Sequence, residues 1–307
     1  MITKPLSRRR ALSLAGGLAL SAALPLPARA LGEVVLGDKS LAIVSDGNLV
    51  LPLDFAFPEP PRDELTGLLA AHGLPTDALY PDCNVTILRD AGRVVVFDVG
   101  AGPNFMPTAG RLGDSLAEAG VDPSEVTDVV FTHAHPDHLW GLIDDFDELV
   151  FPEASYHMGA AEWDFWRDEN TLTRVPEARR TFVVGAQNRL SYLEERISLF
   201  AGGDEILPGV EALDTSGHTP GHMSFAVHGD GESLVIIGDA LTNVAISFER
   251  PDWPSGSDHD AEKGASTRAV LLDRLVADKA AIIGFHLPHP GEGRVERSGS
   301  AYRFVAG

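Results

Sequence analysis

Residues 132–138 read Thr-His-Ala-His-Pro-Asp-His and place three imidazoles and one carboxylate within six consecutive positions. Histidine nitrogen and carboxylate oxygen are the ligands that zinc and other first-row divalent metals bind in proteins. So dense a run predicts ligands for two metal ions. One metal with a hydrogen-bonded aspartate, or a chance cluster of histidines, are the alternatives.

The residues before this run predict how the ligands are held. Residues 126–131 are apolar and rich in β-branched side chains, which indicates a buried strand. Sites in layered α/β folds lie at the carboxyl ends of such strands. Alternate residues of an extended segment share a face, so His133 and His135 can bind one ion. After the proline the chain should turn and direct Asp137 and His138 to a second ion at the start of a helix.

Two metals need more ligands than this run provides, and three further strand-like segments end in suitable residues. His218 follows residues 210–213, Asp239 ends residues 234–239, and His286 ends residues 280–286. A single histidine or aspartate after a strand is more often a capping or loop residue. Four such junctions in one chain favour a shared metal site.

These motifs resemble those of the metallo-β-lactamase superfamily, in order and over nearly the whole chain after residue 30. The resemblance implies a four-layer αββα sandwich and, as cofactors, two divalent metal ions, most commonly Zn2+. It assigns His133, His135 and His218 to one ion, Asp137, His138 and His286 to the other, and Asp239 to a bridge between them. Asp98 matches an early motif whose aspartate orients the metal loop without binding an ion. A turn aspartate after a strand is the plainer interpretation of Asp98.

Three segments resemble a narrower branch of this superfamily. Residues 246–254, 285–293 and 302–305 are similar to the exported branch that contains methyl parathion hydrolase and lactonase-like proteins. His289 competes with His286 for the seventh ligand position. We favour His286 because it lies directly at the strand end and fits the pattern of the branch.

The first thirty residues predict an export signal. A Ser-Arg-Arg-Arg sequence at residues 7–10 precedes an apolar run, and Ala28-Arg29-Ala30 offers small residues for signal peptidase. The paired arginines resemble a twin-arginine signal, with the general secretory route as the alternative. We therefore expect a cleavable signal over residues 1–30, one hydrolase domain over residues 31–307, and a periplasmic or secreted protein.

Charge and cysteine content exclude several classes of partner. The chain has a formal charge of −21, and removal of residues 1–30, which hold five basic and no acidic residues, makes it −26. A nucleic-acid ligand requires positive surface, so none is expected. The expected partner is a small-molecule substrate, without stable membrane association after signal cleavage, and a homodimer is one option for assembly. Cys83 is the only cysteine; an internal disulfide is therefore excluded, and we interpret Cys83 as a small buried residue.

The rest of the chain predicts two β-rich halves covered by helices. The expected strands of the first half are residues 41–44, 85–88 and 94–97, with a hairpin turn at residues 90–92 and helices at residues 108–119 and 187–196. The second half should begin near Ile197, with strands to Ile237, a helix at residues 262–277 and a last strand before His286. Residues 251–264 are expected to form a loop over the site.

The resemblance implies hydrolysis by a hydroxide that bridges the two ions, since paired metals lower the pKa of a shared water from about 15.7 toward about 7. Asp239 would hold the ions together and Asp137 would orient the nucleophile, which makes both catalytic. Six aromatic residues lie in segments that wall the pocket in this branch: Phe105, Trp163, Phe165, Trp166, Phe248 and Trp253. We select Phe105 and Phe248 as pocket residues and expect a small apolar substrate, a lactone, another ester or a phosphotriester.

Three other functions share the same ligands. A metallo-β-lactamase would need a cationic residue for the carboxylate of the drug, and none is evident near the motifs. An iron-dependent oxidoreductase of this fold resembles a pattern with glutamate where this chain has His135. A metal-binding protein without catalysis is disfavoured because every ligand position is filled. His157, His228 and His259 are expected to be structural or exposed.

Overall fold

The structure of this protein is a computed structural model that describes residues 32–307. The predicted export signal, residues 1–30, lies outside the described residues. Two seven-stranded sheets and one small two-stranded sheet form the β-structure. In spatial order the first sheet contains β1 (Gly32–Leu36), β2 (Lys39–Asn48), β5 (Asp82–Asp90), β6 (Arg93–Phe97), β7 (Asp128–Val130), β8 (Ser155–Gly159) and β9 (Ile197–Phe200). The second contains β10 (Glu205–Leu207), β11 (Val210–Asp214), β12 (Met223–Gly229), β13 (Glu232–Ile236), β14 (Ala281–Ile283), β15 (Glu292–Ser298) and β16 (Ala301–Ala306).

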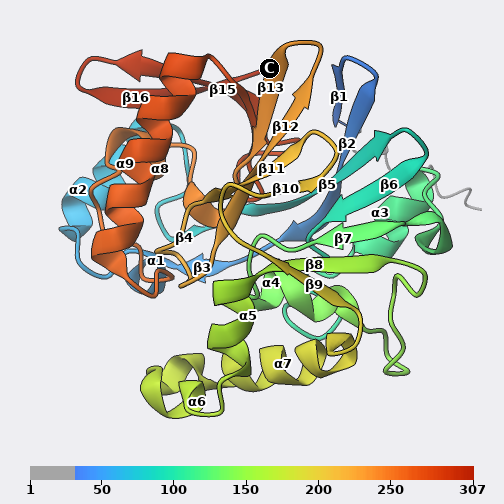
Figure 1. Ribbon diagram of the computed structural model, residues 1–307. Coiled ribbons are helices and arrows are strands. Elements are labelled where there is room, and N and C mark those ends of the chain that lie inside the picture. Colours follow the sequence, from blue (N-terminus) through green and yellow to red (C-terminus); the bar gives the residue numbers. More distant parts are fainter. Residues whose placement is uncertain (1–31) are drawn as a thin grey trace, which may run out of the picture.

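Helices cover the outer face of each large sheet (Figure 1). Those on the first sheet are α3 (Leu112–Glu118), α4 (Pro136–Leu139), α5 (Ala160–Arg167), α6 (Thr171–Arg174) and α7 (Arg180–Leu190), and those on the second are α8 (Ile246–Glu249) and α9 (Ala261–Asp278). A separate segment contains β3 (Leu51–Pro52), α1 (Leu53–Ala56), α2 (Arg62–Ala71) and β4 (Ala78–Leu79). The predicted αββα sandwich is confirmed. Within residues 32–307, no helix is long and apolar enough to cross a membrane.

Apolar side chains from both sheets form the core between them. Val95 and Phe97 of β6 meet Phe225 of β12 and Ile236 of β13 in one buried cluster. The rings of Phe97 and Phe225 lie 5.4 Å apart between their centroids. This contact fixes the two sheets against each other, because aromatic pairs at such distances add to the free energy of burial.

The helix α9 illustrates how the sequence sets the limits of an element. The carboxylate of Asp260 accepts a hydrogen bond from the Lys263 amide, which caps the first turn. Leu271 and Leu275 lie four residues apart and bury one face against the second sheet. The helix ends at Lys279, which adopts a left-handed conformation with φ of 52°.

Some predicted boundaries are wrong. The strand β9 pairs in parallel with β8, so it belongs to the first sheet, and the second sheet begins at β10 instead of near Ile197. The helix expected at residues 108–119 begins only at Leu112, and the helix expected at residues 187–196 runs from Arg180 to Leu190. The loop expected at residues 251–264 is shorter, because α9 already begins at Ala261.

Candidate metal centre

The predicted ligands converge at one edge of the sandwich. The strands β6, β7 and β8 are parallel to one another, as are β13 and β14, so their carboxyl ends point in a common direction within each sheet. His133 and His138 follow β7, His218 follows β11, Asp239 follows β13, and His286 follows β14. Backbone pairing between strands therefore brings together residues that are far apart in the sequence.

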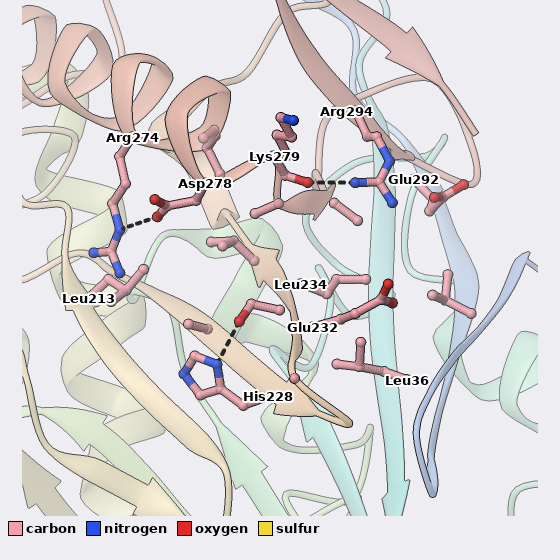
Figure 2. Close-up of a pocket in the computed structure, with 18 of the residues that line it drawn as sticks. Leu36, Leu213, His228, Glu232, Leu234, Arg274, Asp278, Lys279, Glu292 and Arg294 are labelled. Atoms are coloured by element: carbon pink, nitrogen blue, oxygen red, sulfur yellow. Dashed lines mark hydrogen bonds and ion pairs between the residues drawn. The ribbon is translucent and has the colours of Figure 1, made fainter.

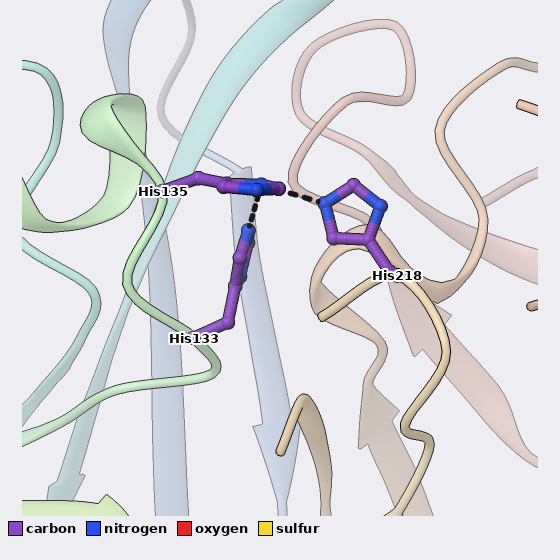
Figure 3. Close-up of side chains that lie close together, drawn as sticks. All are labelled: His133, His135 and His218. Carbon is purple, nitrogen blue, oxygen red and sulfur yellow. Dashed lines mark hydrogen bonds between the residues drawn. The ribbon is translucent and has the colours of Figure 1, made fainter. Parts of the chain in front are cut away.

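Three histidines form the first ligand group. One nitrogen of each of His133, His135 and His218 lies within 4.8 Å of the others, and all three side chains are buried. The Nδ1 atom of His135 lies 3.0 Å from His133 Nε2 and 2.9 Å from His218 Nε2 (Figure 3). Burial and the neighbouring histidines lower the pKa of His133 and His135 well below its usual value. Both rings are therefore neutral, the state in which imidazole nitrogen binds metal.

The second ligand group contains two carboxylates and two imidazoles. Asp137, His138, Asp239 and His286 place ligand atoms within 4.8 Å of one another. The Nε2 atom of His286 lies 3.1 Å from Asp137 Oδ2, and that of His138 lies 3.1 Å from Asp239 Oδ1. These contacts lack the geometry of hydrogen bonds, so that among the described residues Asp137 Oδ2, His138 Nε2 and Asp239 Oδ1 are buried without a hydrogen-bond partner. A divalent cation would satisfy these three atoms, so the residues fit a metal ion.

Asp239 connects the two ligand groups. Its Oδ2 atom lies 3.3 Å from Nε2 of His218 in the first group and 3.2 Å from Nε2 of His286 in the second. The amide of Asp239 donates to Nε2 of the buried His222, 2.9 Å away. Asp239 therefore lies between the two ligand groups, where the sequence motif predicts a bridging carboxylate.

In the second group, carboxylates and imidazoles stabilise each other's charged forms. Burial opposes ionisation of Asp239, but His286 and His138 hold its pKa well below the usual value. Burial likewise opposes the positive charge of His138, but Asp239 and Asp137 raise its pKa well above the usual value. Burial also opposes ionisation of Asp137, but His138 and His286 hold its pKa below the usual value, so imidazole groups stabilise both carboxylates. A bound divalent ion would supply that positive charge instead and leave the imidazoles neutral.

Two carboxylates and one backbone carbonyl outside the ligand groups orient the histidine ligands. Asp98, with φ of 63°, accepts hydrogen bonds from the amide and hydroxyl of Thr132 and contacts His138 Nδ1 at 2.8 Å. Asp258 contacts His218 Nδ1 at 3.1 Å. The carbonyl of Asp82 lies 2.8 Å from His286 Nδ1. Each contact leaves Nε2 of that histidine free to face an ion.

The sequence identified Asp98 but missed Asp258. The motif around Asp98 follows a strand and belongs to a known pattern, whereas Asp258 lies in an irregular loop, 40 residues from His218. Arg268 of α9 donates to the other oxygen of Asp258 at 2.8 Å. No local pattern in the sequence links Asp258, Arg268 and His218.

The remaining histidines divide into two types. His259, predicted to be structural or exposed, belongs to neither ligand group, but its Nε2 atom lies 3.3 Å from His135 Nε2. His289 belongs to neither group, and its Nδ1 atom instead contacts Asn84 Oδ1 at 2.7 Å. His157 contacts Asp128, and His228 contacts Ser233 and Glu211, all away from the site.

Cys83 is buried near the second ligand group. Burial raises the pKa of its thiol to about 11, and a hydrogen bond with His286 opposes this shift. The residue is small and inaccessible, as expected, but it lies closer to the ligands than its position in the sequence indicates.

A pocket of about 270 Å³ opens over the ligands. Its floor includes His135, Asp137, His218, Asp239 and His286, and its walls are mainly apolar residues such as Leu49, Leu51, Phe55, Phe57, Phe105, Met106 and Phe182. The predicted pocket residue Phe105 lines this space. Phe248 does not, because α8 turns its side chain into the core, where it is 0% exposed and its ring lies 5.8 Å from that of Phe304.

A second, larger cavity of about 600 Å³ lies between β1, β13 and the end of α9 (Figure 2). Three hydrogen bonds join residues of its lining: His228 with Ser233, Arg274 with Asp278, and Arg294 with the Lys279 carbonyl. None of the described residues that line it belongs to either ligand group. Size alone therefore does not identify the functional pocket.

The ligand geometry agrees with comparisons to known proteins. The model of the metallo-beta-lactamase superfamily matches residues 81–285. This chain belongs to the metallo-β-lactamase superfamily. Like its hydrolase relatives, this superfamily member is a metal-dependent hydrolase.

Individual superfamily members resemble the chain to different extents. The solved structure of AidC, described as a dizinc quorum-quenching lactonase in complex with a product, has a TM-score of 0.85 and 26% identity and covers 90% of this chain and 97% of its own. The hydrolase AbOPH has a TM-score of 0.84 and 24% identity, with the same coverage of 90% and 97%. An N-acyl homoserine lactonase of Bacillus cereus is 24% identical over 182 residues, which are 57% of this chain and 62% of that protein's length.

Proposed function

We propose that this protein is a dinuclear zinc hydrolase that opens lactones or cleaves other ester bonds, including phosphotriesters, in small apolar molecules. The observation that carries the proposal is the position of Asp239 between two ligand groups on the floor of an apolar pocket. The likeness to AidC, a dizinc lactonase, supports the lactone substrate and the metal. The resemblance to the methyl parathion hydrolase branch supports the phosphotriester.

The ligand residues and the pocket have separate tasks in this proposal. When bound, two zinc ions would supply a nucleophilic hydroxide at neutral pH and polarise the scissile bond. Asp239 would fix the separation of the two sites. Asp137, whose Oδ2 atom faces His286 at 3.1 Å, would orient the attacking water and accept its hydrogen bond. The apolar walls would hold an uncharged substrate and exclude bulk water.

One residue bears on the β-lactamase alternative. Arg179 is the cationic side chain among the described residues that line the pocket. Its Nη2 atom donates to the carbonyls of Gly256 and Asp258 at 2.7 and 2.8 Å, so the guanidinium is engaged with the loop that covers the site. A guanidinium committed in this way is poorly placed to bind the carboxylate of a drug, which favours neutral substrates.

A side-by-side assay tests the proposal. The zinc-loaded protein would be given an acyl-homoserine lactone, methyl paraoxon and a cephalosporin, with Asp239→Asn as the inactive control. We expect turnover of the lactone or the triester and suppression of turnover in Asp239→Asn. Turnover of the cephalosporin alone would make the protein a β-lactamase, and a protein that binds two ions but cleaves none of the three would refute the assignment.

We further propose that the protein works in the periplasm or outside the cell. Residues 1–30 carry the paired arginines and the Ala-Arg-Ala site on which this rests. The acidic charge supports a small-molecule substrate over a nucleic acid. Cell fractionation followed by mass spectrometry of the intact protein would test export, and a cytoplasmic protein that retains its first thirty residues would contradict it.

A further inference from the structure

Glu162 of α5 is a fully buried carboxylate outside both ligand groups. Its side chain is 0% exposed and accepts four hydrogen bonds. Oε1 accepts from the Ala134 amide at 2.9 Å and from Trp166 Nε1 at 2.6 Å. Oε2 accepts from the Thr219 hydroxyl at 2.7 Å and from the Gly221 amide at 3.0 Å. All four of these donors are uncharged, and none belongs to the proposed metal ligands.

Three of the four donors come from the two loops that carry the first ligand group, and the fourth, Trp166, belongs to α5 itself. Ala134 lies between His133 and His135, in the loop after β7 of the first sheet. Thr219 directly follows His218, in the loop after β11 of the second sheet. One carboxylate therefore joins two loops that belong to different sheets and that have no covalent connection near the site.

Packing around Glu162 brings the loops within reach of its short side chain. A β-carbon on Gly221 would lie 2.1 Å from the Glu162 amide nitrogen, so only glycine permits this approach of the loop to α5. The Trp166 ring that donates to Glu162 also packs against His135, with centroids 5.9 Å apart. The helix thus contacts both the backbone between the ligands and one ligand ring.

A buried carboxylate without a cationic partner is costly, and burial raises the pKa of Glu162. Four donors from fixed positions offset that cost only while both loops keep their places. If the loops separate, two donors on one side lose their acceptor in a site that water does not reach. The same arrangement therefore resists any change in the spacing of the two loops.

We propose that Glu162 is a positioning residue that sets the distance between His218 and the pair His133 and His135, and thereby the metal affinity of the three-histidine site. This rests on the proposed metal binding but not on the choice of substrate. Glu162 neither contacts the ions nor takes part in bond cleavage.

The test compares three variants of the full chain by zinc titration against a competing chelator. In Glu162→Gln, one oxygen can still accept from Ala134 and Trp166, but the amide group faces the Gly221 N–H and cannot accept from it. We expect zinc affinity to fall about 10- to 100-fold at one site and to stay within about 3-fold at the other, the range known for residues that orient ligands.

Thr219→Val provides a milder variant that removes one donor and keeps the shape of the side chain. It should weaken the same site in the same direction by a smaller factor. Asp128→Asn is the matched control, because Asp128 is buried at the start of β7 and accepts from Arg93 and Thr127, away from the ligands. It should lower stability and leave both zinc affinities unchanged.

Cobalt substitution gives an independent reading, because the visible spectrum of bound Co(II) reports the geometry of its ligands. We expect a changed spectrum in Glu162→Gln and an unchanged one in Asp128→Asn. Wild-type affinities in Glu162→Gln, or equal losses in Asp128→Asn, would overturn the positioning role. A wild-type protein that binds two ions without hydrolysing any ester would refute the proposed function and leave this inference intact.

Discussion

The contact between Asp258 and His218 shows how a single carboxylate can set the state of a ligand. Asp258 lies between His218 Nδ1 at 3.1 Å and Arg268 at 2.8 Å, and all three side chains are buried. A proton on Nδ1 leaves Nε2 as the free lone pair, the atom that faces Asp239. Asp258 thus determines which nitrogen of His218 can bind an ion, although Asp258 is not itself a metal ligand.

We predict that Asp258→Asn weakens metal binding at the three-histidine site about 10-fold, because an amide orients the imidazole less firmly than a carboxylate. The variant should also be less stable, because Arg268 loses its buried ionic partner. Chelator competition and thermal unfolding measure the two effects. Unchanged affinity would show that the ring is held by its packing instead.

Phe105 and Phe248 differ in what their removal should change. Phe105 lines the pocket beside Phe182, with ring centroids 6.2 Å apart, whereas Phe248 is part of the core. Phe105→Ala should raise KM for an apolar substrate about 10-fold, with little effect on unfolding. Phe248→Ala should lower the free energy of unfolding by about 3–5 kcal/mol and leave KM near the wild-type value. Steady-state kinetics and denaturant titrations would separate them, and the reverse pattern would contradict the structure.

At the scale of single residues, the sequence predicts the candidate ligands but not the residues that position them. His133, His135 and Asp137 could be identified because they crowd one loop after an apolar strand. Glu162 and Asp258 act on loops that are 28 to 59 and 40 residues away along the chain. Hydrogen bonds over such separations leave no periodic or local pattern, so only the folded chain reveals them.

At the scale of elements, Asp46 of β2 explains why α3 starts later than predicted. Its buried carboxylate accepts hydrogen bonds from the amides of Ala101, Gly110 and Leu112. The bond to Leu112 serves as the cap that the helix lacks within its own sequence. A remote residue thus fixes both the start of the helix and the loop that carries Phe105.

Asp46 should also make stability depend on pH. Burial raises its pKa from 3.8 to about 6, against the effect of the backbone hydrogen bonds. The folded state therefore binds the proton more tightly than the unfolded state, so this contribution is present below about 3.8 and is lost as the pH rises through about 6. We expect the free energy of unfolding to fall by about 3 kcal/mol over this range relative to Asp46→Asn. Denaturant titrations at several pH values would measure the difference, and parallel curves for the two proteins would exclude it.

The helix α7 shows a second way in which local patterns mislead. Gly185 lies at its centre and lowers its intrinsic helix propensity, so the predicted helix began too late. A β-carbon there would lie 2.3 Å from the Trp140 ring, which makes glycine necessary for the contact. The prediction for strand β9 failed for a different reason. Its parallel pairing with β8 depends on the path of the helices between the two strands, which no local pattern in the sequence records.

At the scale of the whole molecule, the proposed metal ligands come from both sheets. His133, His135, Asp137 and His138 follow a strand of the first sheet, whereas His218, Asp239 and His286 follow strands of the second. Bound ions would therefore link the two halves of the sandwich. In a chain whose lone cysteine is free and buried, such links replace covalent ones.

Removal of the metals should accordingly destabilise the whole fold. At a free metal concentration of 100 times Kd, each ion adds about 2.7 kcal/mol, so loss of two should cost about 5 kcal/mol. We expect a strong chelator to lower the Tm of the wild-type protein and to have a smaller effect on Asp239→Asn. An unchanged Tm after elemental analysis shows that both ions are gone would contradict this linkage.

The residues that wall the pocket and the residues that could bind metal come from different segments, which affects how substrate preference can evolve. The segment from Leu49 to Phe57 and the helix that holds Phe182 form much of the wall, yet neither supplies a ligand. Substitutions there can reshape the cavity while the inorganic centre stays intact. A library confined to these wall positions would therefore yield altered substrate preference far more often than inactive protein, which makes the chain a suitable scaffold for directed evolution.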